Sequence, residues 1–185
     1  LTREQAAELH GKLPSYPHAE LGSGRSGAVV YARWPIVDAD LPPLTPQGVR
    51  GTKVVLDWRG TRVAVLGVHL HWPLGRRNSH LRNRELATIG RIASASGAVP
   101  LVVAGDLNIT PGSKHFQEGL EGSGLVDCAT GFGIAPSWPA QFPLLGIHID
   151  HCLTSAHWRS IEVSTGPYLG SDHLPVVADL QLVPR

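Results

Sequence analysis

The sequence has no methionine and only two cysteines among its 185 residues. Cys128 and Cys152 fit no metal-binding spacing. They leave two interpretations open: two small buried residues, or one disulfide, which would indicate an oxidising compartment. Because translation starts with methionine, a first residue of Leu1 predicts a fragment, a processed product or a trimmed chain.

The sequence also lacks an excess of charge and a long apolar run. The chain has 16 basic and 15 acidic residues, so affinity for nucleic acid would have to come from a local basic patch. The longest uncharged stretch, residues 128–147, contains three prolines and three glycines, so it predicts a loop region and not a membrane span. With 42% hydrophobic residues, the chain can form one globular domain over residues 1–185 without stabilisation by a disulfide or a metal ion.

Hydrophobic patterns and turn residues predict a mixture of helices and strands. Helices are expected over residues 2–12, 78–95 and 114–120, and a loop rich in Pro, Gly and Ser is expected up to residue 24. Strands are expected over residues 27–33, 53–58, 62–70, 100–104, 147–154, 158–163 and 175–182. Because most strands follow one another as hairpins, we expect an α/β (α+β) fold with helices packed on largely antiparallel sheets.

Polar side chains gather where these apolar strands end, and this clustering is the main evidence for a site. Asp106 and Asn108 directly follow the strand predicted over residues 100–104. Asp106 could orient a water molecule or accept its proton, and Asn108 could donate hydrogen bonds to an anionic oxygen. A turn built from Gly, Asp and Asn would explain the same residues.

Two further acids and two histidines lie at other strand ends. Asp172 and His173 precede the last strand, which suits a metal ligand beside a general base but equally suits a turn. Asp150 interrupts an apolar strand, and a buried carboxylate needs a partner such as an imidazole. His69 ends the strand over residues 62–70, where it could donate to a phosphate oxygen or be a satisfied core residue. Together these side chains suit a hard cation and proton transfer.

Through these residues and the segments around them, the chain resembles the endonuclease/exonuclease/phosphatase superfamily, whose members cleave phosphate esters with a magnesium ion. The segments that carry the resemblance run nearly from end to end: GAVVYARWP at residues 27–35, VHL at 68–70, AGDLNITP at 104–111, IDHCL at 149–153 and GSDHLP at 170–175. The resemblance implies a four-layer αββα sandwich of two mainly antiparallel sheets. It also implies hydrolysis of phosphodiesters or phosphomonoesters by in-line attack of water.

The resemblance further implies a role for each matching residue. Asp106 would orient or deprotonate the attacking water, and Asn108 would hold a phosphate oxygen. His173 would contact the scissile phosphate, and Asp150 would fix the ring of His173. His69 would donate a hydrogen bond from the other side of the phosphate.

The metal is expected to be Mg²⁺, with Mn²⁺ as a substitute, and Asp172 is its expected ligand. Family members also use a Glu at the end of an early strand, which has no counterpart here, because Glu4, Glu8 and Glu20 lie in a helix or loop. We therefore expect that the first strand-helix-strand segment of the domain is missing and that the sandwich is truncated at its N-terminal edge. This piece should then be weakly active or inactive.

Two other function classes remain open from the sequence. One is a non-catalytic binding module on the same fold. The other is a metal-free esterase with Ser171 or Ser113 as nucleophile, which the absence of a G-x-S-x-G motif disfavours.

The substrate is expected to be a phosphate ester, with nucleic acid and phospholipid head groups as candidates, and the protein is expected to be a monomer. Arg76, Arg77, Arg82 and Arg84 could form a basic surface for nucleic acid, or only the solvated face of a helix. A resemblance to bacterial members with transmembrane helices ahead of the domain predicts a membrane-associated whole protein.

Overall fold

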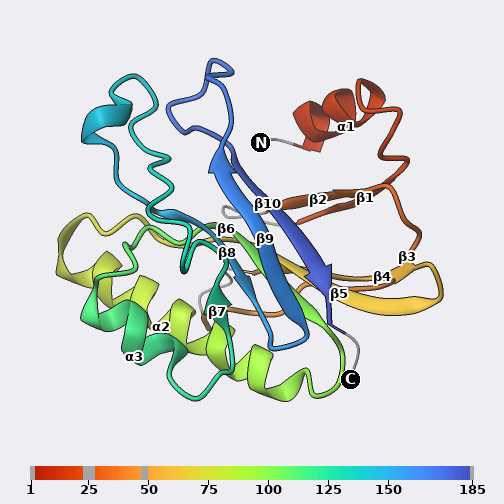
Figure 1. Ribbon diagram of the computed structural model, residues 1–185, viewed down its shortest axis with the longest axis horizontal. Helices are drawn as coiled ribbons and strands as arrows, with labels where there is room; N and C mark the ends of the chain where they lie inside the picture. The colour runs from red at the N-terminus through yellow and green to blue at the C-terminus, as the bar shows by residue number, and fades with distance from the viewer. Residues whose placement is uncertain (1–2, 23–27, 47–49, 184–185) are drawn as a thin grey trace.

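A six-stranded sheet lies at the centre of this computed structural model, which describes residues 3–22, 28–46 and 50–183 (Figure 1). Its strands, in spatial order, are β3 (Ile36–Asp40), β4 (Thr52–Trp58), β5 (Thr61–His69), β6 (Leu101–Asp106), β8 (Asp150–Thr154) and β7 (Val126–Asp127). The pairing of β5 with β6 is parallel and the other pairings are antiparallel. The sheet is thus mixed but mainly antiparallel.

Two helices cover one face of this sheet, α2 (Gly75–Ala95) and α3 (Lys114–Leu120) (Figure 1). Along β5 every second side chain, including Leu66 and Val68, is buried against them. Leu86 and Ile89 of α2 and Phe116 of α3 also belong to this core. The core forms because the apolar side chains on one face of the strand, at every second position, pack against the apolar stripe of a helix.

The other face of the sheet is covered by two antiparallel strand pairs. One pair is β1 (His18–Leu21) with β2 (Val29–Ala32), and the other is β9 (Trp158–Thr165) with β10 (Val176–Leu182). Gly67 of β5 faces β2, because a Cβ on it would lie 3.3 Å from Val30. Helix α1 (Arg3–Gly11) lies outside the first pair, where Tyr31 donates a hydrogen bond of 2.8 Å to the carbonyl of Ala6. The expected four-layer architecture is confirmed.

Three strands differ from the predictions. β1 occupies part of the segment predicted as a loop, and β3 and β7 were not predicted. These strands have two to five residues, and the alternation of exposure in them is weak or absent. Such short segments become strands because a neighbouring strand supplies hydrogen bonds, which no local pattern reports. The predicted helix start at residue 2 and strand start at residue 27 lie outside the described residues.

The uncharged stretch of residues 128–147 is mostly irregular, as predicted. It contains one short 3₁₀ helix, η1 (Pro143–Leu145), and an isolated bridge between Trp138 and Ile147. In the described part of the chain, no helix combines the length and the apolar character that crossing a bilayer would require.

Candidate active site

The candidate site lies on three adjacent strands whose register aligns its residues. His69 of β5 is the partner of Asp106 in β6, and Asp106 is in turn the partner of Asp150 in β8. Partners in neighbouring strands point to the same face of a sheet, so these three side chains form one row. Residues that are distant in the sequence are thereby brought side by side at one edge of the fold.

Gly105 allows β6 to lie close to β5 beside this row. Its φ is +140°, and a Cβ at this position would lie 1.9 Å from the carbonyl oxygen of Val68. Only glycine fits that backbone conformation and that distance. Gly105 therefore determines where Asp106, the next residue, enters the site.

The Asp106 carboxylate is largely buried and held on both oxygens. The backbone N–H of Asn108 donates to Oδ1 at 2.8 Å, and the Asn108 side-chain amide donates to Oδ2 at 3.0 Å. His69 Nε2 lies 3.6 Å from Oδ2, on a side chain that is 57% exposed. Burial raises the pKa of Asp106, the Asn108 amide opposes this and the charge of Asp150 reinforces it, so the pKa lies above its ordinary value.

Asn108 is buried in a left-handed conformation, with φ of +52°. Its side-chain nitrogen also donates to the carbonyl of Leu70 at 3.0 Å, so both amide hydrogens have partners within the protein. The backbone carbonyl of Asn108 accepts a hydrogen bond of 2.6 Å from Arg82 Nη1. A hydrogen bond from the Asn108 amide to a phosphate would therefore require one of these partners to be exchanged.

Arg82 and Glu85 of α2 contact backbone atoms next to the site, from the face of the sheet that the helices cover. Arg82 is 8% exposed, and burial lowers the pKa of its guanidinium. Glu85 is fully buried and accepts two hydrogen bonds from His71, one from the backbone N–H at 2.9 Å and one from ring Nδ1 at 2.5 Å. Sequence reasoning missed Glu85 and considered Arg82 only as a surface residue. The signal was present, because both share a helix face with Leu86 and Ile89.

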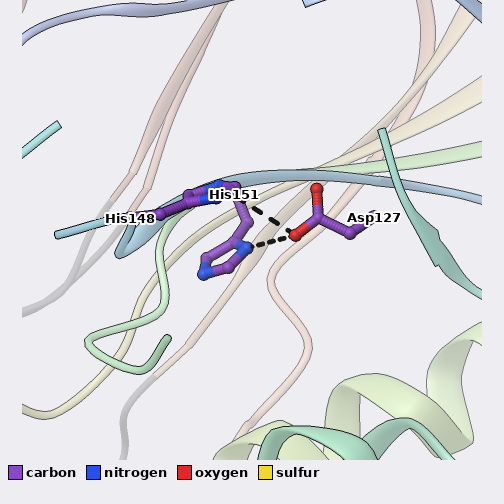
Figure 2. Close-up of side chains that lie close together, drawn as sticks. All are labelled: Asp127, His148 and His151. Carbon is purple, nitrogen blue, oxygen red and sulfur yellow. Dashed lines mark hydrogen bonds and ion pairs between the residues drawn. The ribbon is translucent and has the colours of Figure 1, made fainter. Parts of the chain in front are cut away.

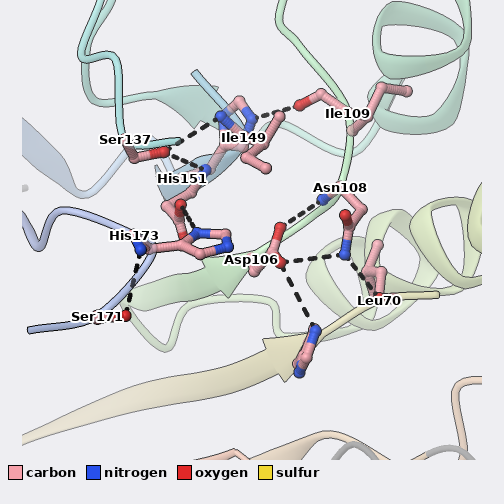
Figure 3. A network of polar contacts seen from close by, with 11 residues as sticks. Leu70, Asp106, Asn108, Ile109, Ser137, Ile149, His151, Ser171 and His173 are labelled. Carbon is pink, nitrogen blue, oxygen red and sulfur yellow. Dashed lines mark hydrogen bonds and ion pairs between the residues drawn. The ribbon is translucent and has the colours of Figure 1, made fainter. Parts of the chain in front are cut away.

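His173, which Figure 3 shows in the same network as Asp106 and Asn108, forms a hydrogen-bonded pair with Asp150. His173 Nδ1 lies 2.7 Å from Asp150 Oδ2, and the backbone N–H of His173 donates to Ser171 Oγ at 3.2 Å. Burial lowers the pKa of His173, but the hydrogen bond and charge of Asp150, with the charges of Asp106 and Asp172, outweigh it and raise the pKa above its ordinary value. The imidazole is therefore a cation over a wider pH range than a free histidine.

The site offers oxygen ligands for a divalent cation. Ligand atoms of Asp106, Asp150 and His173 all lie within 4.8 Å of one another. Two carboxylates this close suit a hard cation such as Mg²⁺, which one or two carboxylates plus a substrate phosphate can hold. Asp172, the ligand expected from the sequence, is exposed and does not belong to this group. The other five predicted residues, His69, Asp106, Asn108, Asp150 and His173, are brought together.

A second group of titratable side chains lies behind the site: Asp127, His148 and His151 (Figure 2). His151 Nδ1 is 2.7 Å from Asp127 Oδ2, and its Nε2 is 2.8 Å from the carbonyl oxygen of Ile109. The rings of His148 and His151 are stacked at 4.3 Å with 18° between their planes. Nearly parallel rings cannot direct their in-plane lone pairs at one ion, so this group is better suited to holding β7, β8 and the Asn108 loop together.

A cavity of about 520 Å³ opens beside the Asp150–His173 pair. It lies between the large sheet and β10, and its walls are mainly apolar. Residues of β6, β8 and β10 line it together with Ser171 and Leu174. Asp150 and His173 thus belong both to the candidate site and to the wall of this cavity.

Comparison with known proteins identifies the family of this chain. The profile of the Endonuclease/Exonuclease/phosphatase family matches residues 2–173. No match was found among curated protein sequences.

Solved structures share the fold at low sequence identity. A humanized TDP2 from D. rerio is 15% identical with a TM-score of 0.79, over 98% of this chain and 82% of that chain. A mannosyl-6-phosphatase from Bacteroides thetaiotaomicron is 15% identical with a TM-score of 0.73, over 97% and 82%. Sphingomyelinase C from Streptomyces griseocarneus is 22% identical with a TM-score of 0.68, over 95% and 82%. With the family match over most of its length, this chain belongs to the endonuclease/exonuclease/phosphatase family, whose members hydrolyse phosphate esters.

Proposed function

We propose that this domain hydrolyses phosphodiester or phosphomonoester bonds with the help of a divalent cation, Mg²⁺ in the first place. The observation that carries the proposal is the convergence of Asp106, Asp150 and His173 within 4.8 Å. Hydrolysis of a phosphate ester adds negative charge to an anion, so catalysis depends on positive charge and hydrogen-bond donors around phosphorus. A protonated imidazole beside two carboxylates that can hold a cation meets that need.

His173 and His69 would act on the phosphate oxygens. The hydrogen bond from Nδ1 to Asp150 leaves Nε2 of His173 as the atom that donates to the phosphate, and the raised pKa favours the protonated form of the ring. His69, with its exposed ring, would donate from the opposite side of Asp106. Asp150 orients His173 in the way a carboxylate commonly fixes a catalytic imidazole.

Asp106 would orient the attacking water and accept its proton. A carboxylate accepts about four hydrogen bonds or ligands, so the two bonds from Asn108 leave capacity for water and cation.

Asp106 and Asp150 would hold Mg²⁺, with Asp172 as a candidate third ligand if its exposed side chain turns inward. Bound Mg²⁺ would supply positive charge that stabilises the charge developing on the phosphate. Two carboxylates form a sparse ligand set, so we expect weak Mg²⁺ binding that improves when a phosphate is present, and slow turnover.

The names of the similar structures suggest three substrate classes to test. They are single-stranded DNA, phosphorylated sugars and sphingomyelin. One neighbour is TDP2 solved with a single-strand DNA product, another is a mannosyl-6-phosphatase and a third is a sphingomyelinase. Bis-p-nitrophenyl phosphate and p-nitrophenyl phosphate serve as class-neutral diester and monoester substrates.

The decisive test is hydrolysis of these two substrates with Mg²⁺ or Mn²⁺, compared with EDTA. We expect activity that EDTA abolishes and that falls by roughly 10²–10⁴-fold in Asp106→Ala and His173→Ala. Ser113→Ala, at a serine outside the site, is the matched control and should retain activity. Activity that persists in EDTA would contradict the proposal. Phosphate binding without turnover would instead favour the non-catalytic binding module.

A further inference from the structure

Cys128 and Cys152 bring two free thiols together behind the site. Cys128 follows β7 directly, Cys152 lies in β8, and the backbone N–H of Cys128 donates to the carbonyl of Cys152 at 2.8 Å. Their sulfur atoms are 3.1 Å apart. A disulfide bond is about 2.05 Å long, so the two sulfurs need to approach by only about 1 Å to bond.

The two thiols differ in exposure. Cys128 is 2% exposed, whereas Cys152 is half-buried and lines the cavity of about 520 Å³ beside Asp150 and His173. Cys128 Sγ also lies 3.9 Å from the hydroxyl of Thr154. Of the two sulfurs, that of Cys152 is therefore the one that a small molecule in the cavity reaches first.

We propose that Cys128 and Cys152 form a reversible disulfide site that is oxidised by a small hydroperoxide entering through this cavity. Nothing in the phosphoesterase proposal requires this pair, and its chemistry is independent of phosphate hydrolysis. The geometric basis is the 3.1 Å separation of the sulfurs together with access to one of them.

The reaction balances with hydrogen peroxide as the oxidant. Cys152 loses its thiol proton to solvent, and the thiolate attacks one peroxide oxygen; the O–O bond breaks, and the departing hydroxide takes a proton from solvent to become water. Cys152 is then a sulfenic acid. The sulfur of Cys128 attacks it and forms the S–S bond, and the displaced hydroxyl leaves with the Cys128 proton as a second water. The two cysteines lose two electrons and the peroxide gains them.

Closing this bond would join β7 to β8 next to the residues that hold the site. Cys128 follows Asp127, and Cys152 follows His151, the two ends of the 2.7 Å hydrogen bond described above. The oxidised protein should therefore melt at a higher temperature than the reduced protein, because the cross-link restrains the unfolded chain.

The experiment treats the fully reduced chain with hydrogen peroxide, alkylates remaining thiols in denaturant and measures the intact mass. We expect a loss of about 2 Da, no alkylated cysteine, and full recovery of two alkylated cysteines after dithiothreitol. Peptide mapping at acid pH should identify a single cross-linked pair. Cys128→Ser and Cys152→Ser should each abolish the 2 Da loss, and their circular dichroism spectra report whether they fold.

Three results would overturn the proposal. They are two alkylated cysteines after peroxide treatment, addition of oxygen to one cysteine as sulfinic acid without a cross-link, or a disulfide between two chains on a non-reducing gel. The wild-type mass alone decides the question, so a serine variant that fails to fold does not affect the conclusion.

Discussion

At the scale of single residues, the site depends on a glycine as much as on its acids. Gly105 has a φ that side chains rarely adopt, and a Cβ on it would lie only 1.9 Å from the Val68 carbonyl oxygen. Strand β6 can therefore lie next to β5 and present Asp106 beside His69 only if this position has no side chain.

We expect Gly105→Ala to destabilise the protein by on the order of 2–4 kcal/mol, because backbone strain and a steric clash act together. Gly60→Ala is the matched control, since Gly60 also has a positive φ of +84° but no atom within 4 Å of the added Cβ. It should cost only about 1 kcal/mol. Urea unfolding of the three proteins measures both values, and equal losses in the two variants would refute the role given to the clash.

The acidic residues of the site could be predicted one by one from the sequence, whereas their supports could not. Asp106 follows an apolar strand, Asp150 interrupts one and His173 precedes one, and each of these is a local signal. His151 also lies within an apolar strand, but its partners Asp127 and Ile109 are 24 and 42 residues away. No local pattern reports such contacts, because they exist only once the strands pair.

At the scale of elements, α2 both covers the sheet and supports the Asn108 loop. Leu86 and Ile89 pack in the core, while Arg82 and Glu85 on the same side of the helix bind backbone atoms at the ends of β5 and β6. A charged helical residue usually faces solvent, so sequence patterning assigned Arg82 to the surface. Its burial is tolerated because the Asn108 carbonyl and the Asn83 side chain accept its hydrogen bonds.

We therefore predict that Arg82→Met lowers stability by about 1–3 kcal/mol, since it leaves the Asn108 carbonyl without its donor. If the proposed function holds, kcat should fall more than KM rises, because Arg82 positions Asn108 and Asp106 without touching substrate. Arg82→Lys should restore part of both losses. Arg84→Met, at an exposed position two residues along the same helix, is the control and should change neither. Guanidinium unfolding and steady-state kinetics measure these effects.

At the scale of the whole molecule, stability should depend on pH through the hydrogen-bonded pair of Asp127 and His151. Burial raises the pKa of Asp127, but hydrogen bonds from His151 and from the Ala129 amide outweigh it, so the pKa lies below its ordinary value of 3.8. A carboxyl group with a lowered folded-state pKa stabilises the protein at pH above its unfolded-state value. That stabilisation is lost as the pH falls through the folded-state value.

Asp127→Asn should thus cost on the order of 1–3 kcal/mol at pH 7, because it removes a charged hydrogen-bond acceptor of His151. The difference from wild type should persist down to about pH 5 and shrink as the pH falls below about 4. Unfolding curves between about pH 7 and about pH 2.5 test this. A difference that stays constant over the whole range would show that the charge of Asp127 does not contribute.

The sequence by itself determined the elements and the chemistry at their ends. Apolar runs set the long strands and α2, and the polar residues near their ends predicted a set of acids and histidines suited to a hard cation and to proton transfer. Tertiary structure alone decided that His69, Asp106 and Asp150 lie in one row, that β1, β3 and β7 are strands, and that Arg82, Glu85 and His151 support the site. The physical reason is that local patterns encode which face of an element is buried, whereas strand register and buried polar contacts arise only when distant segments pack together.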